Sequence, residues 1–122
     1  MLVKCTRGED MKTQDFNNLV EEQFGICRAI LEAKGKEYAP DDEDRLSAFK
    51  TAGSVLHRTP IQALGGQMSK HTISLFEMIE NNCTDNDLWL EKLTDQINYL
   101  LLLKGLLCDS EAPGEPVSQV LN

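Results

Sequence analysis

Apolar residues recur along this chain at helical rather than strand spacing. The first such run extends from Phe16 to Leu31, with intervals of three and four residues that place its members on one helix face. Thr13 is a suitable N-cap and Gly35 a suitable C-terminal stop, so a helix is predicted over residues 13–35. The sequence shows no alternating strand pattern and no internal repeat, which predicts an all-α fold.

Two further helices are predicted in the middle of the chain. The first covers about residues 43–56, with Asp41 or Asp42 as its cap, although Gly53 lowers the helix propensity of its second half. The next begins at Thr59, where an N-cap, a proline and a glutamine follow one another in the order of a capping box. It is expected to bend at its paired glycines and to end near residue 82.

The last helix is predicted over residues 85–108 and contains the leucine run 100–103. Its second half is apolar nearly all round, which predicts deep packing. One side of the leucine run has no evident partner in so small a bundle, which points to a homo-oligomer. The alternative is burial beneath the N-terminal arm or the tail.

Length and composition indicate one domain. A chain of 122 residues with 41% hydrophobic content can form a single core. We therefore expect a four-helix bundle over residues 13–108, a short N-terminal arm over residues 1–12, and an acidic tail over residues 109–122 that is mobile or docks on a partner.

Charge and cysteine content restrict the function. The net charge of -8 argues against direct nucleic-acid binding, whereas a nucleotide bridged by a metal ion remains compatible. The sequence has neither an apolar span for a membrane nor a long apolar leader. Four widely spaced cysteines suggest reduced thiols rather than zinc ligands, so a cytoplasmic protein is expected.

Acidic residues on the third and fourth helices form a candidate metal site. Glu91, Asp95 and Asn98 share one side of the last helix. Antiparallel packing of the two helices would bring Glu77 and Glu80 opposite them. Converging carboxylates need a cation, for which Mg²⁺ is suited, and a spare carboxylate can activate water. The alternative is a solvated helix face.

These acids also carry a family resemblance. Glu91, Asp95 and Asn98 precede an aromatic residue and a leucine run, and Glu77 and Glu80 form an E-x-x-E before them. The arrangement resembles the last motifs of the MazG-like all-α nucleotide pyrophosphohydrolases. This resemblance implies a bundle that dimerises or tetramerises and that releases pyrophosphate from nucleoside triphosphates. It implies Mg²⁺ binding by the four acids, with Glu77, Glu91 and Asp95 as catalytic residues.

One position departs from that pattern. The usual last motif is E-x-x-D, but the residue three before Asp95 is Lys92, so that only Glu91 remains one position earlier. The departure affects the hydrolysis that the resemblance implies more than it affects nucleotide binding.

A second resemblance extends over more of the chain. The residues that carry it lie in segments 33–38, 44–50, 59–64, 70–74 and 89–99. These segments together resemble small phage and prophage proteins grouped with nucleotide-modification-associated domains. The resemblance implies a viral or prophage origin and work related to nucleotides.

Several other side chains are candidates for contacting the nucleotide itself. Lys34 and Arg45 suit phosphates, and Tyr38 suits a base. The alternative is a surface on which cations neutralise neighbouring acids, which we prefer for Lys36 and Lys50.

Three polar residues on the third and fourth helices complete the candidate set. Lys70 either pairs with Glu77 or reaches a phosphate, and Asn98 adds an amide. His71 lies on an apolar stripe, where a buried, hydrogen-bonded imidazole is the preferred interpretation over a catalytic base.

Three functions are compatible with these features. The first is a Mg²⁺-dependent nucleoside triphosphate pyrophosphohydrolase. The second is a non-catalytic protein that sequesters a host nucleotide or a nucleotide immune signal, and the third is a helical module that binds another protein.

Overall fold

The computed structural model describes residues 10–39 and 44–109 of the chain. They form four helices, α1 (Thr13–Tyr38), α2 (Ser47–Leu56), α3 (Pro60–Glu80) and α4 (Asn86–Cys108), and the described residues contain no strand. The prediction of an all-α fold with four helices is confirmed. The predicted arm lies outside the described residues up to residue 9, as does the predicted tail from residue 110.

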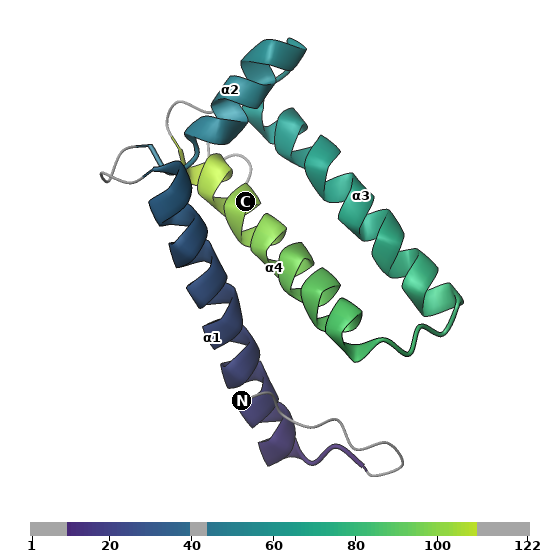
Figure 1. The fold of residues 1–122 in the computed structure, drawn as a ribbon. Coiled ribbons are helices and arrows are strands. Elements are labelled where there is room, and N and C mark those ends of the chain that lie inside the picture. Colours follow the sequence, from purple (N-terminus) through teal and green to yellow (C-terminus); the bar gives the residue numbers. More distant parts are fainter. Residues whose placement is uncertain (1–9, 40–43, 110–122) are drawn as a thin grey trace.

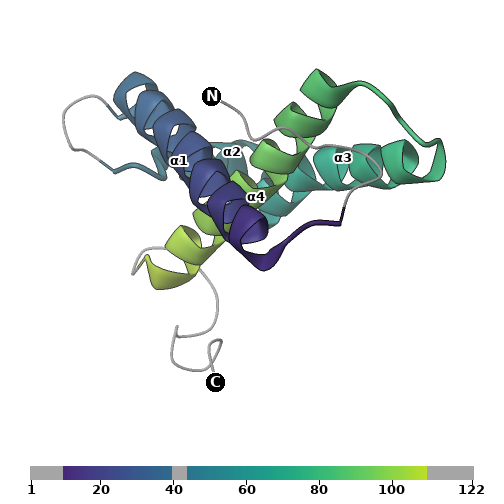
Figure 2. The ribbon, with the colours of Figure 1, turned by 90° about the horizontal axis from the view of Figure 1, so that it is seen from below.

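Helix α4 lies at the centre of the arrangement. It packs between α1 and α3, and the short α2 packs against α3 (Figure 1). Helices α3 and α4 run in opposite directions, and α1 crosses α4 at a steep angle when the molecule is seen from below (Figure 2). Each of the two long outer helices therefore depends on α4 for its packing.

The core joins three of the helices. Phe49 of α2, Leu64 of α3 and Leu106 of α4 form a buried cluster. Partly buried apolar side chains surround it, namely Leu46, Ile61, Met68, Tyr99, Leu102 and Leu103. Helix α1 contributes a single buried residue, Cys27. The core thus fixes α2, α3 and α4 together, and α1 lies against their outer surface.

Local signals fixed the starts of α3 and α4 as predicted. The Gln62 backbone N–H donates to Thr59 Oγ1, and the Thr59 N–H donates to the Gln62 side chain, each at 3.0 Å. This reciprocal pair is a capping box, and Pro60 follows it at the first helical position. At α4, Asp85 Oδ1 accepts the N–H of Leu88 at 3.1 Å.

The predicted end of the first helix was wrong. Helix α1 continues through Gly35 to Tyr38. A Cβ on Gly35 would lie 3.0 Å from Nε of Arg45, so the missing side chain leaves room for that guanidinium. This glycine serves a tertiary contact, and Tyr38 therefore lies on a helix rather than in a loop.

The second helix begins later than predicted, at Ser47. The carbonyl of Asp44 accepts the Ser47 N–H at 3.1 Å, and the Asp44 carboxylate accepts the Leu46 N–H at 3.0 Å, so a turn occupies the expected first residues. The candidate caps Asp41 and Asp42 lie outside the described residues.

Gly53 lies where the sequence predicted a weakened second half of this helix. The helix nevertheless continues past it to Leu56. A Cβ on Gly53 would lie 2.7 Å from the carbonyl oxygen of Arg58 and 3.1 Å from the nitrogen of Pro60. The glycine is therefore required by the close approach of the chain as it turns from α2 into α3.

The second half of α4 is not deeply packed as predicted. Leu100 and Leu101 are 51% and 43% exposed, whereas Leu106 is fully buried. Leu100 and Leu101 are thus exposed side chains of the leucine run, whereas the arm and the tail, which were the alternative cover for this run, lie largely outside the described residues. Helix α3 also continues as one helix through its paired glycines.

Replacing Gly53 with alanine should destabilise the protein by roughly 1–3 kcal/mol, because the added methyl group meets backbone atoms that have no room to move. Gly65→Ala is the matched control, since nothing lies within 4 Å of its Cβ position. That control should stabilise α3 by about 0.5–1 kcal/mol. Urea denaturation measures both changes, and equal effects of the two substitutions would contradict this account of Gly53.

Candidate ligand-binding cavity

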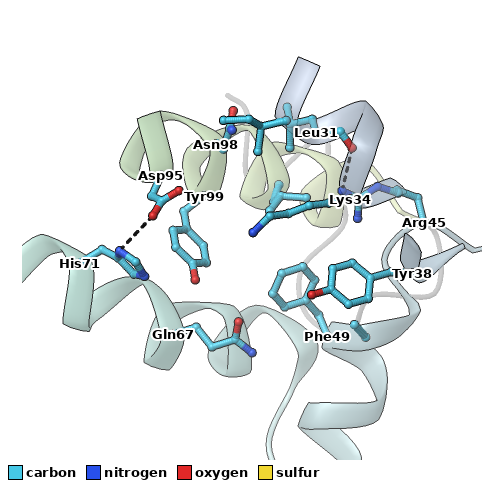
Figure 3. Close-up of a pocket in the computed structure, with 13 residues that line it drawn as sticks. Leu31, Lys34, Tyr38, Arg45, Phe49, Gln67, His71, Asp95, Asn98 and Tyr99 are labelled. Atoms are coloured by element: carbon cyan, nitrogen blue, oxygen red, sulfur yellow. Dashed lines mark hydrogen bonds and ion pairs between the residues drawn. The ribbon is translucent and has the colours of Figure 1, made fainter. Parts of the chain in front are cut away.

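A cavity of about 370 Å³ lies where the four helices meet (Figure 3). Its volume falls within the range of small-molecule sites in proteins. The lining residues come from all four helices and from the turn before α2, and they are Ile30, Leu31, Lys34, Tyr38, Arg45, Ala48, Phe49, Gln67, His71, Asp95, Asn98, Tyr99 and Leu102.

Six of the ten predicted site residues line this cavity. They are Lys34, Tyr38, Arg45, His71, Asp95 and Asn98. The remaining four, Lys70, Glu77, Glu80 and Glu91, are exposed and lie outside it. The structure thus brings the predicted nucleotide contacts together, except for Lys70, and separates most of the predicted metal ligands from them.

The four acids do not converge as the sequence predicted. Helix α3 turns Leu64, His71 and Met78 inward, and these residues follow one another at intervals of seven. Glu77 and Glu80 consequently lie on the outer side of the helix. Among the described residues, no group of three or more His, Cys, Asp or Glu side chains is placed to hold a metal ion. These residues therefore do not fit a preformed four-carboxylate Mg²⁺ site.

Two cations form one wall of the cavity. Arg45 donates from Nη2 to the carbonyl oxygen of Leu31 at 3.3 Å, and Gly35 provides the space that lets its guanidinium lie against α1. Figure 3 shows the amino group of Lys34 extending into the cavity between Phe49 and Tyr99. The contact with α1 orients the arginine in the absence of any ligand.

Aromatic rings form much of the remaining surface. Tyr38, Phe49 and Tyr99 approach from three different helices (Figure 3). Burial raises the pKa of Tyr99 above its usual value of 10.0, and the charge of Asp95 and the neighbouring Tyr38 raise it further. Tyr99 is therefore a neutral phenol at physiological pH, able to donate a hydrogen bond.

His71 and Asp95 lie on facing helices. His71 Nδ1 is 3.7 Å from Asp95 Oδ2, a distance that is too long for a hydrogen bond but suits an ion pair when the imidazole is protonated. Within the described structure this nitrogen is buried without a hydrogen-bond partner. The predicted buried, hydrogen-bonded imidazole was therefore wrong, because Nδ1 is unpaired and the ring lines a cavity beside Tyr99, with ring centroids 5.0 Å apart.

Asn98 places a buried amide in the cavity wall. Its residue is 6% exposed, and neither Oδ1 nor Nδ2 has a hydrogen-bond partner within the described structure. A buried polar group without a hydrogen bond lowers the free energy of unfolding by about 1–3 kcal/mol. Proteins rarely leave both the oxygen and the nitrogen of a buried amide without a hydrogen bond. A ligand that accepts from and donates to this amide would remove that penalty.

Gln67 also lines the cavity but was not among the predicted site residues. It precedes His71 by four positions on α3, so the two side chains share a helix face. This four-residue spacing is the sequence signal that could have identified Gln67 as a cavity residue. It becomes informative only once the inward face of α3 is known.

Comparisons of the chain with protein-family models, with curated proteins and with solved structures found no match. None of the helices within the described residues is both long and apolar enough to cross a membrane. The chemistry of the cavity is therefore the main indication of function.

Asn98→Leu should stabilise the ligand-free protein by about 1 kcal/mol, because a side chain of similar size replaces an unpaired amide. Thr94→Val is the matched control on the same helix. Thr94 is also buried, but its Oγ1 accepts a hydrogen bond of 2.8 Å from Gln23. Loss of this hydrogen bond in Thr94→Val should therefore destabilise the protein by roughly 1–3 kcal/mol. Chemical denaturation measures both effects, and destabilisation by Asn98→Leu would show that the amide is satisfied.

Proposed function

We propose that the cavity binds a nucleotide or a nucleotide-derived small molecule. The observation that carries the proposal is the buried, unpaired amide of Asn98 in the cavity wall. An amide offers one acceptor beside two donor hydrogens, which is the pairing that the edge of a nucleobase requires.

The remaining lining residues match the other parts of a nucleotide. Tyr38 and Phe49 offer ring faces for stacking against a base. Lys34 and Arg45 supply positive charge for phosphate oxygens. Arg45 is already oriented by Leu31, which reduces the entropy that binding must overcome, and its planar guanidinium suits two phosphate oxygens at once.

Magnesium enters this proposal only as an ion that the phosphates carry. Mg²⁺ commonly binds one or two protein carboxylates together with substrate phosphates. Of the four predicted metal ligands, Asp95 alone lines the cavity. Affinity in the presence and absence of Mg²⁺ therefore distinguishes a bound nucleotide from a bound nucleotide–metal complex.

Hydrolysis is the second candidate function, and the facing pair of His71 and Asp95 favours it. A carboxylate or imidazole at this position could deprotonate a water molecule beside a bound phosphate. The predicted catalytic residues Glu77 and Glu91 lie outside the cavity, however. We therefore favour binding without turnover, which corresponds to the sequestration of a nucleotide.

Titration calorimetry with purine and pyrimidine nucleotides, linear and cyclic, tests the proposal directly. Arg45→Lys and Lys34→Ala should each weaken binding by about tenfold or more, because each removes or reshapes a phosphate contact. Lys70→Ala is the control, since it removes the same charge from an exposed position outside the cavity. It should leave the affinity unchanged.

Analysis of the ligand after denaturation separates the two functions. Recovery of the intact nucleotide supports sequestration. Release of pyrophosphate that disappears in Asp95→Asn supports hydrolysis. Absence of binding by every nucleotide, with the protein folded, would refute both.

A further inference from the structure

The charged groups that line the cavity are few, and opposite charges lie apart. Lys34 and Arg45 are cationic and Asp95 is acidic, while His71 is charged only when its imidazole is protonated. Figure 3 shows Arg45 and Asp95 at opposite ends of the cavity, with the amino group of Lys34 between them. A bound ligand therefore meets positive charge at one end and a carboxylate at the other.

The two cations match the charge of one phosphate group. A phosphate monoester carries a charge of about −1.5 to −2 at pH 7, which Lys34 and Arg45 together can neutralise. The guanidinium can contact two oxygens of the same phosphate, and the ammonium group can contact the third. Each further phosphate would add negative charge, and the lining residues provide no further permanent cation for it.

The cations next to cavity residues in the sequence do not supply that charge. Lys50 follows Phe49, but its Nζ lies 2.6 Å from Asp44 and 3.1 Å from Asp109, and it does not line the cavity. Lys70 is exposed and also lies outside the cavity. The described residues offer no cluster of acids that would hold a metal ion beside a longer phosphate chain. A triphosphate would therefore bring charge that this site does not neutralise.

The opposite end of the cavity favours uncharged donors. The Asp95 carboxylate repels phosphate, but it can accept hydrogen bonds from the hydroxyl groups of a ribose or from the amino group of a base. The imidazole of His71 is too distant, at 3.7 Å, to donate a hydrogen bond to it. The buried amide of Asn98, three residues further along α4, also lacks a hydrogen-bond partner among the described residues. Both side chains thus suit the polar, uncharged part of a nucleotide.

The size of the cavity agrees with a small nucleotide. Its volume of about 370 Å³ lies near the lower limit of small-molecule sites, which span about 300–1,000 Å³. We propose that the ligand is a nucleoside monophosphate bound without a metal ion, with its phosphate between Lys34 and Arg45 and its sugar or base donating hydrogen bonds to Asp95. This inference rests on the proposed binding of a nucleotide and names the number of its phosphates. A monophosphate contains no pyrophosphate to release, so the inference agrees with sequestration rather than hydrolysis.

Titration calorimetry of the full chain with the mono-, di- and triphosphates of each common nucleoside tests this specificity. In the presence of a chelator, the monophosphate of the preferred nucleoside should bind at least about tenfold more tightly than its triphosphate, because like charges brought together oppose binding. Added Mg²⁺ should leave the affinity for the monophosphate unchanged.

Asp95→Asn tests the role of the carboxylate through selectivity rather than through affinity alone. The substitution keeps an oxygen that accepts hydrogen bonds and removes the negative charge, so the preference for the monophosphate over the triphosphate should fall several-fold. Glu91→Gln is the matched control, because it makes the same change at an exposed position one turn earlier on α4, outside the cavity. It should leave that preference unchanged.

The outcomes separate this inference from the proposed function. Tighter binding of the triphosphate, or a loss of triphosphate affinity in Asp95→Asn only when Mg²⁺ is present, would overturn the monophosphate specificity and leave the cavity as a nucleotide site. An unchanged preference in Asp95→Asn would refute the assigned role of the carboxylate. Absence of binding by every nucleotide would overturn this inference together with the proposed function.

Discussion

The contact between Leu106 of α4 and Leu64 of α3, closed by Phe49 of α2, is the interaction on which the rest of the structure depends. It holds α4 in the centre, where the helix must satisfy neighbours on two sides. Thr94 accepts a hydrogen bond from Gln23 of α1, and Gln96 accepts one from Thr72 of α3. The arc of α4 between these two bonds carries Asp95, Asn98 and Tyr99 into the cavity.

This position explains why Asp95, Asn98 and Tyr99 line the cavity rather than lie on a solvated face. An amide that faced water would hydrogen-bond to it, whereas Asn98 is 6% exposed and has no hydrogen-bond partner among the described residues. The unpaired amide lowers the stability of the folded protein by at least about the contribution of one hydrogen bond. A folded domain of this size tolerates such a cost only because it is a small part of the total free energy of unfolding. Cations and aromatic rings lie around the same amide, and for this reason we propose a phosphorylated, ring-containing ligand.

How far the sequence predicted this structure depends on the range of each signal. The starts of α3 and α4 were predicted because caps act within four residues. The end of α1 was not, because Gly35 provides space for Arg45, which is distant in sequence. Six of the predicted site residues do line one cavity, but the predicted convergence of the acids was wrong. Whether the acids converge depends on which side of α3 packs inward. Residue spacing alone did not determine whether Glu77 lies on the inner or the outer side of that helix.

We propose that Asn98 is the hydrogen-bonding group of a nucleotide site. The most direct measurement is the ¹⁵N-correlated NMR spectrum of its side-chain amide, assigned by comparison with Asn98→Leu, during titration with the nucleotides that bind. The account predicts that the two Asn98 amide protons shift and exchange more slowly with water when the site fills. Binding that leaves the Asn98 signals unchanged, and that shifts the backbone signals around Glu77 and Glu80 instead, would contradict it.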